Sequence, residues 1–284
     1  MKSANSICSG IVTYNPEIDR LKKVISSIVD QVEELVICDN GSVNASDIKE
    51  TIELYSNVTA LFSNKNEGIA RALNNICEYA KVNHYEWVLT LDQDTICPNN
   101  IIQELSRALF IEKVGIICPA VMYEGVNLTT GNKNQDIEED NACMTSASLT
   151  NIQAWERVGG FRDDYFIDFV DNEFCMKLQL YGYKILRVNT CRISHQLGDS
   201  KQKRFLWKIM IGTSHKPWRI YYMMRNNIWF IKEYGAFLNV TKEYFKVLYI
   251  FINELFFSDT KFLTFENGLK GIYEGMKYNR KCSM

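Results

Sequence analysis

Two aspartates separated by a single residue carry the strongest chemical signal in the chain. Asp92 and Asp94 follow the uncharged residues 87–91, whose composition is that of a strand buried on both faces. Open α/β sheets bind ligands at the carboxyl ends of such strands. Mg²⁺ and Mn²⁺ prefer oxygen ligands, commonly one or two carboxylates together with phosphate oxygens. The pair therefore predicts a divalent-cation site for a diphosphate; the alternative is a solvated turn before a helix at Ile101.

A second acidic cluster follows at residues 165–174. Asp168, Asp171 and Glu173 lie there among aromatic and aliphatic side chains. Because apolar surroundings favour the neutral form of a carboxyl group, the cluster could supply a general base. The alternative is an ordinary helix N-terminus, where acidic side chains complement the helix dipole.

Polar residues also follow the first two predicted strands. Thr13, Tyr14 and Asn15 come after the first strand, and Asp39 ends the second. An acid in that place takes ribose hydroxyls or base N–H groups in nucleotide-binding folds, although an aspartate is also a common turn former. No Gly-x-Gly-x-x-Gly follows the first strand, which argues against NAD, FAD and a P-loop.

Two further residues have both a chemical and a plain interpretation. His195 could complete the shell of a metal ion as an imidazole ligand, or it could be a surface loop residue. Arg225, with Tyr222 and Asn226 near it on a predicted helix, could hold a diphosphate, or it could belong to a solvated helix face. The residues alone leave both choices open.

The elements that must position these residues alternate between strands and helices. The 284 residues and the 46% hydrophobic content favour one large α/β domain with an appended helical segment. Amphipathic helices separate the first predicted strands, which specifies a doubly wound, mostly parallel sheet over about the first 120 residues. These strands are expected at residues 7–13, 35–38, 58–62, 87–91 and 114–118.

The second half is less regular. Residues 123–141 are polar and acidic, which predicts a mobile surface loop. Strands are expected at residues 142–149 and 184–188, and residues from 205 to the end are expected to be helical and aromatic.

Charge is distributed unevenly along the chain. Residues 1–200 hold 17 basic and 28 acidic residues, a balance of −11, whereas residues 201–284 hold 15 and 6, a balance of +9. A basic, aromatic tail suits an anionic membrane surface or a phosphate-bearing partner. Nucleic acid is not expected, because no recognition motif accompanies the charge. No uncharged run approaches the ~18 residues of a spanning helix.

The first residues and the cysteines indicate the cellular compartment in which we expect the protein. The first residues lack the apolar segment and cleavage site of a secretory signal, so we expect a cytoplasmic protein. The nine cysteines are odd in number, form no Cys-x-x-Cys pair and mostly lie in apolar runs. They are expected to be buried, reduced thiols, neither disulfides nor a zinc site.

Taken together, these residues resemble family 2 glycosyltransferases of the GT-A fold, in particular bacterial rhamnosyltransferases of polysaccharide and O-antigen assembly. The resemblance runs from about Ile7 to His195, with the motifs in the same order. It includes an Asn-x-Gly-x-Ala-x-Ala-x-Asn pattern at residues 66–74 and an Asp-x-Asp that binds metal. It implies a nucleotide-sugar site formed by Thr13, Tyr14, Asn15, Asp39, Asn66, Gly68, Arg71, Asp92, Gln93 and Arg225, with Mg²⁺ or Mn²⁺ held by Asp92, Asp94 and His195.

The resemblance also implies a base. A Gly-Gly-Phe at residues 159–161 precedes the acidic cluster, in which Asp171 takes the position of the usual catalytic base. Val170 stands where many relatives have Glu, so the choice between Asp171 and Asp168 stays open. His195 begins a stretch similar to the family's His-x-x-Gly, and residues 222–226 resemble a Tyr-x-x-Arg-Asn helix that follows the catalytic domain.

The resemblance implies an inverting, metal-dependent transfer of L-rhamnose from dTDP-rhamnose to a lipid-diphosphate-linked glycan at the inner membrane face. Residues 1–204 would be the GT-A catalytic domain, with a nucleotide-sugar half at 1–120 and an acceptor half at 121–204. Residues 205–284 would be a membrane-proximal helical extension, and a homo-oligomer is left open. The alternatives are transfer of galactofuranose, glucose or GlcNAc, a metal-dependent phosphohydrolase, and a non-catalytic nucleotide-binding protein.

Overall fold

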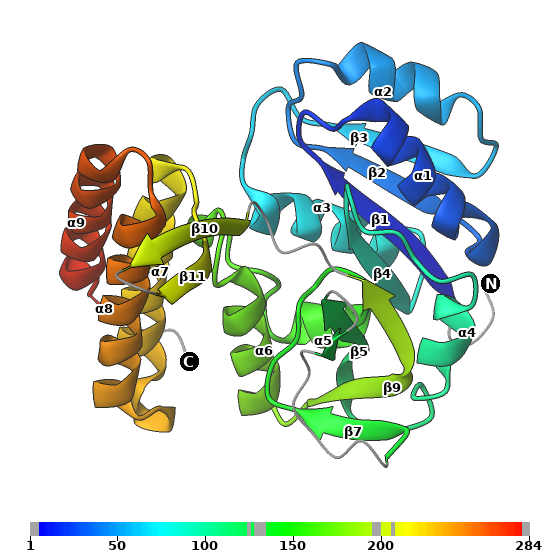
Figure 1. Cartoon of the computed structure of the whole chain (residues 1–284). Helices are drawn as coiled ribbons and strands as arrows, with labels where there is room; N and C mark the ends of the chain where they lie inside the picture. Colours follow the sequence, from blue (N-terminus) through cyan, green and yellow to red (C-terminus); the bar gives the residue numbers. More distant parts are fainter. Residues whose placement is uncertain (1–5, 124–125, 128–134, 195–199, 206–207, 280–284) are drawn as a thin grey trace. The chain divides into compact units, whose positions relative to one another are not determined.

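A computed structural model describes residues 6–123, 126–127, 135–194, 200–205 and 208–279 (Figure 1). The chain forms two compact units. An α/β unit comprises Met1–Phe166 and Val170–His195, and a helical unit comprises Ile167–Phe169 and Gln196–Met284. Residues 167–169, which directly precede the helix that carries Asp171 and Glu173, therefore belong to the helical unit.

The described part of the α/β unit is built on a mixed nine-stranded sheet. The strands lie in the order β3-β2-β1-β4-β8-β5-β9-β7, and β6 pairs with β5. Neighbours run parallel from β3 to β4 and between β5 and β9, whereas β8, β6 and β7 run antiparallel to their partners. The strands are β1 (Ile7–Thr13), β2 (Leu35–Asp39), β3 (Val58–Phe62), β4 (Trp87–Asp92), β5 (Val114–Tyr123), β6 (Val126–Asn127), β7 (Ile137–Asp140), β8 (Ser148–Asn151) and β9 (Lys184–Ser194).

Helices cover both faces of the central strands, which explains why these strands carry no charged residue before their last position. Ile11 packs in one core cluster with residues of α1 and α4, whereas Gly10, the preceding residue of β1, faces Ile76 of α3. The helices of this unit are α1 (Ile18–Ile28), α2 (Ala45–Ile52), α3 (Ile69–Val82), α4 (Ile101–Ser106), α5 (Ile152–Arg157) and α6 (Val170–Leu180). Short 3₁₀ turns, η1 (Val29–Gln31) and η2 (Asp163–Tyr165), complete it.

Strand register aligns the ends that carry the predicted donor-site residues. Thr13 pairs with Asp39 across β1 and β2, and Val12 pairs with Asp92 across β1 and β4. Because these three strands are parallel, their carboxyl ends meet at one edge of the sheet. The predicted alternation of strands and helices in the first 120 residues is confirmed by this arrangement.

The prediction of a loop over residues 123–141 was wrong for its described part. Residues 137–140 form β7, where Glu138 lies opposite Arg187 of β9. The Arg187 guanidinium pairs with the Glu138 and Asp140 carboxylates, two residues apart and thus on one face of the strand. An acidic composition suggested solvent, but its basic partner lies almost fifty residues away in the sequence. The strand predicted at 142–149 is likewise shorter, beginning at Ser148.

The helical unit also begins differently from the prediction. Residues 200–205 and 208–213 are paired in a β-hairpin, β10 (Ser200–Phe205) and β11 (Lys208–Thr213), where helix was expected from residue 205. Basic residues in the first strand hid its pairing with the Ile-rich second strand. Helices follow: α7 (Pro217–Tyr234), α8 (Val240–Phe257) and α9 (Lys261–Lys277), with the 3₁₀ turn η3 (Gly235–Phe237) between the first two.

The three long helices pack side by side (Figure 1). Met224 and Ile228 of α7 form an apolar core with Val247 and Phe251 of α8. Helices α7 and α9 approach each other closely: a Cβ on Gly271 would clash with the Tyr221 carbonyl oxygen. Among the described residues, no helix is long and apolar enough to cross a membrane.

Candidate functional site

Asp39 is the centre of a polar network at the carboxyl edge of the sheet. The carboxylate is fully buried and accepts hydrogen bonds from Thr13 Oγ1 (3.0 Å) and the Ser42 backbone N–H (2.9 Å). The Ser42 hydroxyl donates to the same carboxylate (2.5 Å). Buried carboxylates need such partners, and here they fix Asp39 against β1. Ser42 was not singled out from the sequence.

The loop after β1 is tied to two other predicted donor-site segments. The Tyr14 backbone N–H donates to Gln93 Oε1 (2.8 Å), and the Asn15 N–H donates to Ser42 Oγ (2.7 Å). Asn15 also has a positive φ of 47°, and its side-chain oxygen accepts from the Val43 N–H (2.8 Å). The structure thus brings Tyr14, Asn15 and Gln93 together.

Asn66 and Gly68 lie at the start of α3, next to the loop after β2. The Asn40 amide donates to Asn66 Oδ1 (3.0 Å) and to the Gly68 carbonyl (3.0 Å). Gly68 has a φ of +89°, and a Cβ there would lie 2.6 Å from the Phe166 carbonyl oxygen. The glycine is therefore required both by its conformation and by the close approach of another chain segment.

The Asp92-Gln93-Asp94 segment is held by residues that the sequence did not indicate. The Asp92 backbone N–H donates to Ser146 Oγ (3.1 Å), and the Arg20 guanidinium donates to the Asp94 carbonyl oxygen (Nε, 3.1 Å). The Asp94 carboxylate is exposed and makes no hydrogen bond or ion pair to the residues that the structure describes.

The residues around this segment fit a hard divalent cation only together with a ligand's phosphates. No cluster of three or more metal-ligating side chains occurs among the described residues. One or two carboxylates, completed by phosphate oxygens and water, are the usual protein contribution to a Mg²⁺ site. Asp92 and Asp94 offer such a donor set. His195 lies outside the described residues.

Asp171 and the Asp-x-Asp segment are linked through two adjacent hydroxyl residues. Thr145 Oγ1 donates to Asp171 Oδ1 (3.0 Å), and Ser146 contacts Asp92 N–H as described above. The neighbouring Ala147 has a positive φ of 62° and donates its N–H to the Thr90 carbonyl (2.7 Å), which fastens this turn to β4. Only the low bulk of residues 142–149 hinted at this role.

A cavity of about 370 Å³ opens beside Asp171. Its lining includes Asp171 and Asn172 at the start of α6, Cys143, Met144 and the buried Arg187. Hydrogen bonds with the Cys118 and Cys175 side chains, and then burial, raise the pKa of Cys143 well above its usual value. Near Asp39, burial raises the pKa of Cys38 to about 11. Thiols with such pKa values are protonated at neutral pH and are poor nucleophiles.

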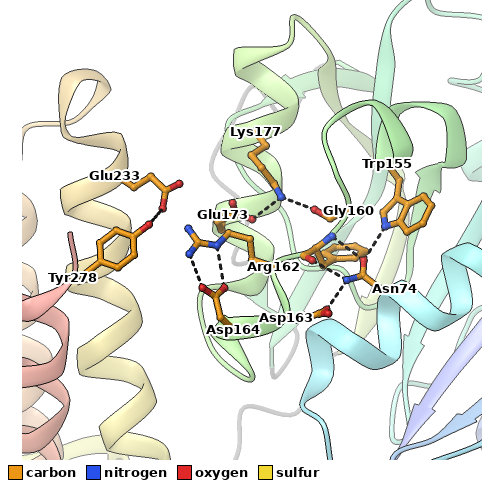
Figure 2. A network of polar contacts seen from close by, with 11 residues as sticks. Asn74, Trp155, Gly160, Arg162, Asp163, Asp164, Glu173, Lys177, Glu233 and Tyr278 are labelled. Carbon is orange, nitrogen blue, oxygen red and sulfur yellow. Dashed lines mark hydrogen bonds and ion pairs between the residues drawn. The ribbon is translucent and has the colours of Figure 1, made fainter. Parts of the chain in front are cut away.

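Arg71, predicted to line the donor pocket, takes part in a network that ties α3 to the segment before α6, and Figure 2 shows the part of it around Asn74. The Arg71 guanidinium pairs with Asp163 (3.1 Å), and both side chains are about half exposed. Asn74 makes four hydrogen bonds: its amide donates to Asp163 Oδ1 and the Phe161 carbonyl, and its oxygen accepts from Trp155 Nε1 and the Phe161 N–H. Lys177 reaches from α6 to the Gly160 carbonyl and to Glu173.

Asp168 and Arg225 lie in the helical unit. The Asp168 carboxylate accepts from both Nε (3.0 Å) and Nη2 (2.8 Å) of Arg219. Arg225 stacks over the Trp229 ring, 4.1 Å from its centroid, and its Nε donates to Asn226 Oδ1 (2.9 Å). Asp168 and Asp171, the two candidate bases, thus have different surroundings. Their roles and those of the other predicted site residues stay predictions.

Comparisons with known proteins give a matching family and a similar protein. Residues 9–187 match the model of the family described as Glycosyl transferase family 2. The dTDP-rhamnosyl transferase RfbF of Shigella flexneri is 25% identical over 298 residues, which cover 97% of this chain and 99% of that protein.

Solved structures with low sequence identity share the fold. GalNAc-T7 with UDP, GalNAc and Mn²⁺ aligns with a TM-score of 0.66 and 14% identity over 96% of this chain, which spans 56% of that protein's chain. The mannosyltransferase PcManGT of Pyrobaculum calidifontis, in complex with GDP-Man and Mn²⁺, aligns with a TM-score of 0.57 and 15% identity. The alignment covers 95% of this chain and 72% of that protein's chain. S. aureus TarS 1-349 aligns with a TM-score of 0.58 and 15% identity, over 96% of this chain and 81% of that protein's chain.

These likenesses confirm a mixed α/β fold of the GT-A type with a helical C-terminal region. The family model spans more than half of the 284 residues. The protein is therefore a glycosyltransferase and belongs to glycosyl transferase family 2.

Proposed function

We propose that the protein transfers L-rhamnose from dTDP-rhamnose to a hydroxyl of a lipid-diphosphate-linked glycan, with inversion at the sugar. The observation that carries the proposal is the link from the Asp-x-Asp segment through Ser146 and Thr145 to Asp171. A diphosphate-binding element and a candidate base are thereby held on one turn. The similarity to a dTDP-rhamnosyl transferase over 97% of the chain supports the choice of donor.

The donor nucleotide would bind at the carboxyl edge of β1, β2 and β4, within residues 1–120. The buried Asp39 would accept hydrogen bonds from the base or ribose. Tyr14 and Asn15, through their backbone links to Gln93 and Ser42, would shape the pocket between the nucleoside and the diphosphate. Asn66, Gly68 and Arg71 would line its sugar side, and Arg225 is proposed to contact the diphosphate.

Asp92 and Asp94 would hold Mg²⁺ or Mn²⁺, with His195 as a third ligand. The bound cation would neutralise charge on the departing dTDP. Two similar structures contain Mn²⁺ with a nucleotide or nucleotide sugar, which supports a divalent metal for this chain as well.

Asp171 would act as the general base. Its carboxylate would take the proton of the acceptor hydroxyl while that oxygen forms a bond to the anomeric carbon and the bond from this carbon to dTDP breaks. Attack opposite the leaving group inverts the configuration, and no covalent enzyme intermediate is needed. The cavity that Asp171 lines, most of whose lining residues fall within residues 121–204, is the proposed acceptor site.

A donor screen followed by a turnover assay tests this proposal. Thermal shift with Mn²⁺ would compare dTDP-rhamnose with UDP-galactofuranose, UDP-glucose and UDP-GlcNAc, because the true donor stabilises the protein by mass action. We expect dTDP-rhamnose to give the largest shift, and dTDP release to require a polyprenyl-diphosphate-linked sugar. Release with water alone would favour a phosphohydrolase, and binding without turnover would favour a nucleotide-binding protein.

The C-terminal extension, residues 205–284, is proposed to hold the enzyme peripherally at the inner face of the membrane. Phe245 and Tyr249 of α8 are 67% and 70% exposed, and Phe262 and Tyr273 of α9 are 78% and 59% exposed. The inward face of α9 carries small residues instead, namely Thr264, Gly268, Gly271 and Gly275. Large apolar side chains on the outer faces, beside a balance of +9 over residues 201–284, suit an anionic lipid interface.

A further inference from the structure

The turn between η2 and α6 has a backbone conformation that its own residues disfavour. Phe166, Asp168 and Phe169 have φ values of 63°, 62° and 65°, and none of them is glycine. Such left-handed conformations persist only where surrounding contacts enforce them, and they cluster at functional sites. Val170, the first residue of α6, follows directly, and Asp171 is the second.

The upstream end of the turn is fastened within the α/β unit. The Ile69 backbone N–H, at the first residue of α3, donates to the Phe166 carbonyl (2.6 Å). Gly68 leaves the space that this approach needs. Phe166 is thus joined to the segment proposed to line the donor pocket.

The next three residues are fastened by one face of α7. The Asn226 amide, on a residue with no exposed surface, donates to the carbonyls of Ile167 (2.7 Å) and Asp168 (2.9 Å). Arg219 pairs with the Asp168 carboxylate, and the Phe230 ring packs against the Phe169 ring at 5.6 Å. Arg219, Asn226 and Phe230 are seven and four residues apart, a spacing that puts them on one side of the helix.

The chemistry of Asn226 makes the contact specific. Two backbone carbonyls accept from its NH₂ group, while its oxygen accepts from Arg225 Nε (2.9 Å). An aspartate of the same shape has no N–H to donate to either carbonyl. Only an amide of this length satisfies both sides of the arrangement.

The geometry points to Arg219 and Asn226 as positioning residues for the transfer reaction: α7 holds residues 167–169 in their strained conformation and so determines where α6 begins and how Asp171 is presented. The inference rests on the proposal that Asp171 is the base. It gives Asp168 a positioning role through Arg219. It also gives the helical unit a part in catalysis beyond membrane attachment.

The test compares Asn226→Asp and Arg219→Gln with Glu254→Gln in the full-length chain. Glu254 is a matched control, because it is buried in the same unit and its carboxylate pairs with His215 (2.7 Å), not with the turn. For the first two variants we expect a loss of kcat for acceptor-dependent dTDP release of about 10- to 100-fold, since small misplacements of reacting groups cost this much. Affinity for dTDP with Mn²⁺ should stay within about 2-fold. Glu254→Gln should keep kcat whatever its melting temperature.

A double-variant comparison separates positioning from general damage. In an Asp171→Asn background, Asn226→Asp should lower the residual rate by less than about 2-fold, because groups that act as a unit are non-additive. Arg219→Gln takes its place in this comparison if Asn226→Asp does not fold. A kcat within about 2-fold of wild type in the folded variants, or a full additional loss in the Asp171→Asn background, would overturn the inference. An active Asp171→Asn would overturn the proposed base and the inference together; an inactive one beside an active Asn226→Asp overturns the inference alone.

Discussion

At the scale of single residues, Thr145 and Ser146 make the connection on which the proposed chemistry depends. The sequence singled out the carboxylates, because paired acids after a strand are conspicuous. It could not single out the two hydroxyl residues, because Ser and Thr are common and their partners, Asp171 and Asp92, lie 26 and 54 residues away. Arg219 escaped notice for the same reason.

Thr145→Val should lower kcat about 10-fold while donor affinity stays unchanged, because the hydrogen bond that orients Asp171 is lost but the shape of the side chain is kept. Thr145→Ser retains the hydroxyl and should keep most of the activity. Steady-state kinetics with dTDP-rhamnose and the lipid-linked acceptor would measure both. An equal loss in the two variants would mean that the hydroxyl is not what matters.

Asp94→Ala should remove the enhancement of dTDP binding by Mn²⁺ and leave the fold intact, because the exposed carboxylate has no structural partner among the described residues. Calorimetric titration of dTDP with and without Mn²⁺ measures the effect. Asp47→Ala, an exposed acid on α2, is the control and should behave like wild type. Equal enhancement by metal in Asp94→Ala would remove this residue from the cation site.

At the scale of elements, the sequence predicted what local pattern determines. Leu21, Val24, Ile25 and Ile28 recur at helical spacing and are the buried face of α1. The strand β7 was missed because its formation depends on pairing with Arg187 in β9, and no local sequence pattern encodes that pairing. The hairpin of β10 and β11 was missed because the aromatic residues from 205 onward suggested helix.

Gly68→Ala should destabilise the protein more than Gly182→Ala. Both glycines have a positive φ, +89° and +78°, so both substitutions strain the backbone. Only at Gly68 would the new Cβ approach another segment, at 2.6 Å from the Phe166 oxygen, whereas a Cβ added at Gly182 would meet no atom within 4 Å beyond its own chain neighbours. Overpacking typically adds about 1–3 kcal/mol to the loss of unfolding free energy. Urea denaturation measures the difference, and equal losses would contradict the close approach.

At the scale of the whole molecule, the chain combines an acidic α/β part with a basic, outwardly apolar helical part. The charge asymmetry was visible in the sequence, and so was the aromatic content of the tail. The outward orientation of the large side chains could not be predicted from the sequence, because it depends on the small-residue face of α9 that packs against α7. The partner of these outer faces remains part of the proposal.

The protein should float with anionic vesicles and less with neutral ones, since each basic residue near anionic lipid adds about 1 kcal/mol of attraction. Replacing Phe245 and Tyr249 with Ser should weaken flotation, because both side chains are exposed on α8. Phe110→Ser is the matched control, an 80% exposed side chain in the α/β unit. Failure to float with either lipid, together with concentration-dependent dimerisation, would assign the surface to a second copy of the chain.

The rate of sugar transfer by Asp171→Asn tests the central claim most directly. The amide keeps the shape of the side chain but cannot take a proton, and a general base typically contributes ~10² to 10⁴-fold. The account predicts a loss of this size in kcat, with the dissociation constant for dTDP and Mn²⁺ nearly unchanged and a smaller loss in Asp168→Asn. Nearly full transfer by Asp171→Asn, beside an inactive Asp168→Asn, would contradict it and move the base to Asp168.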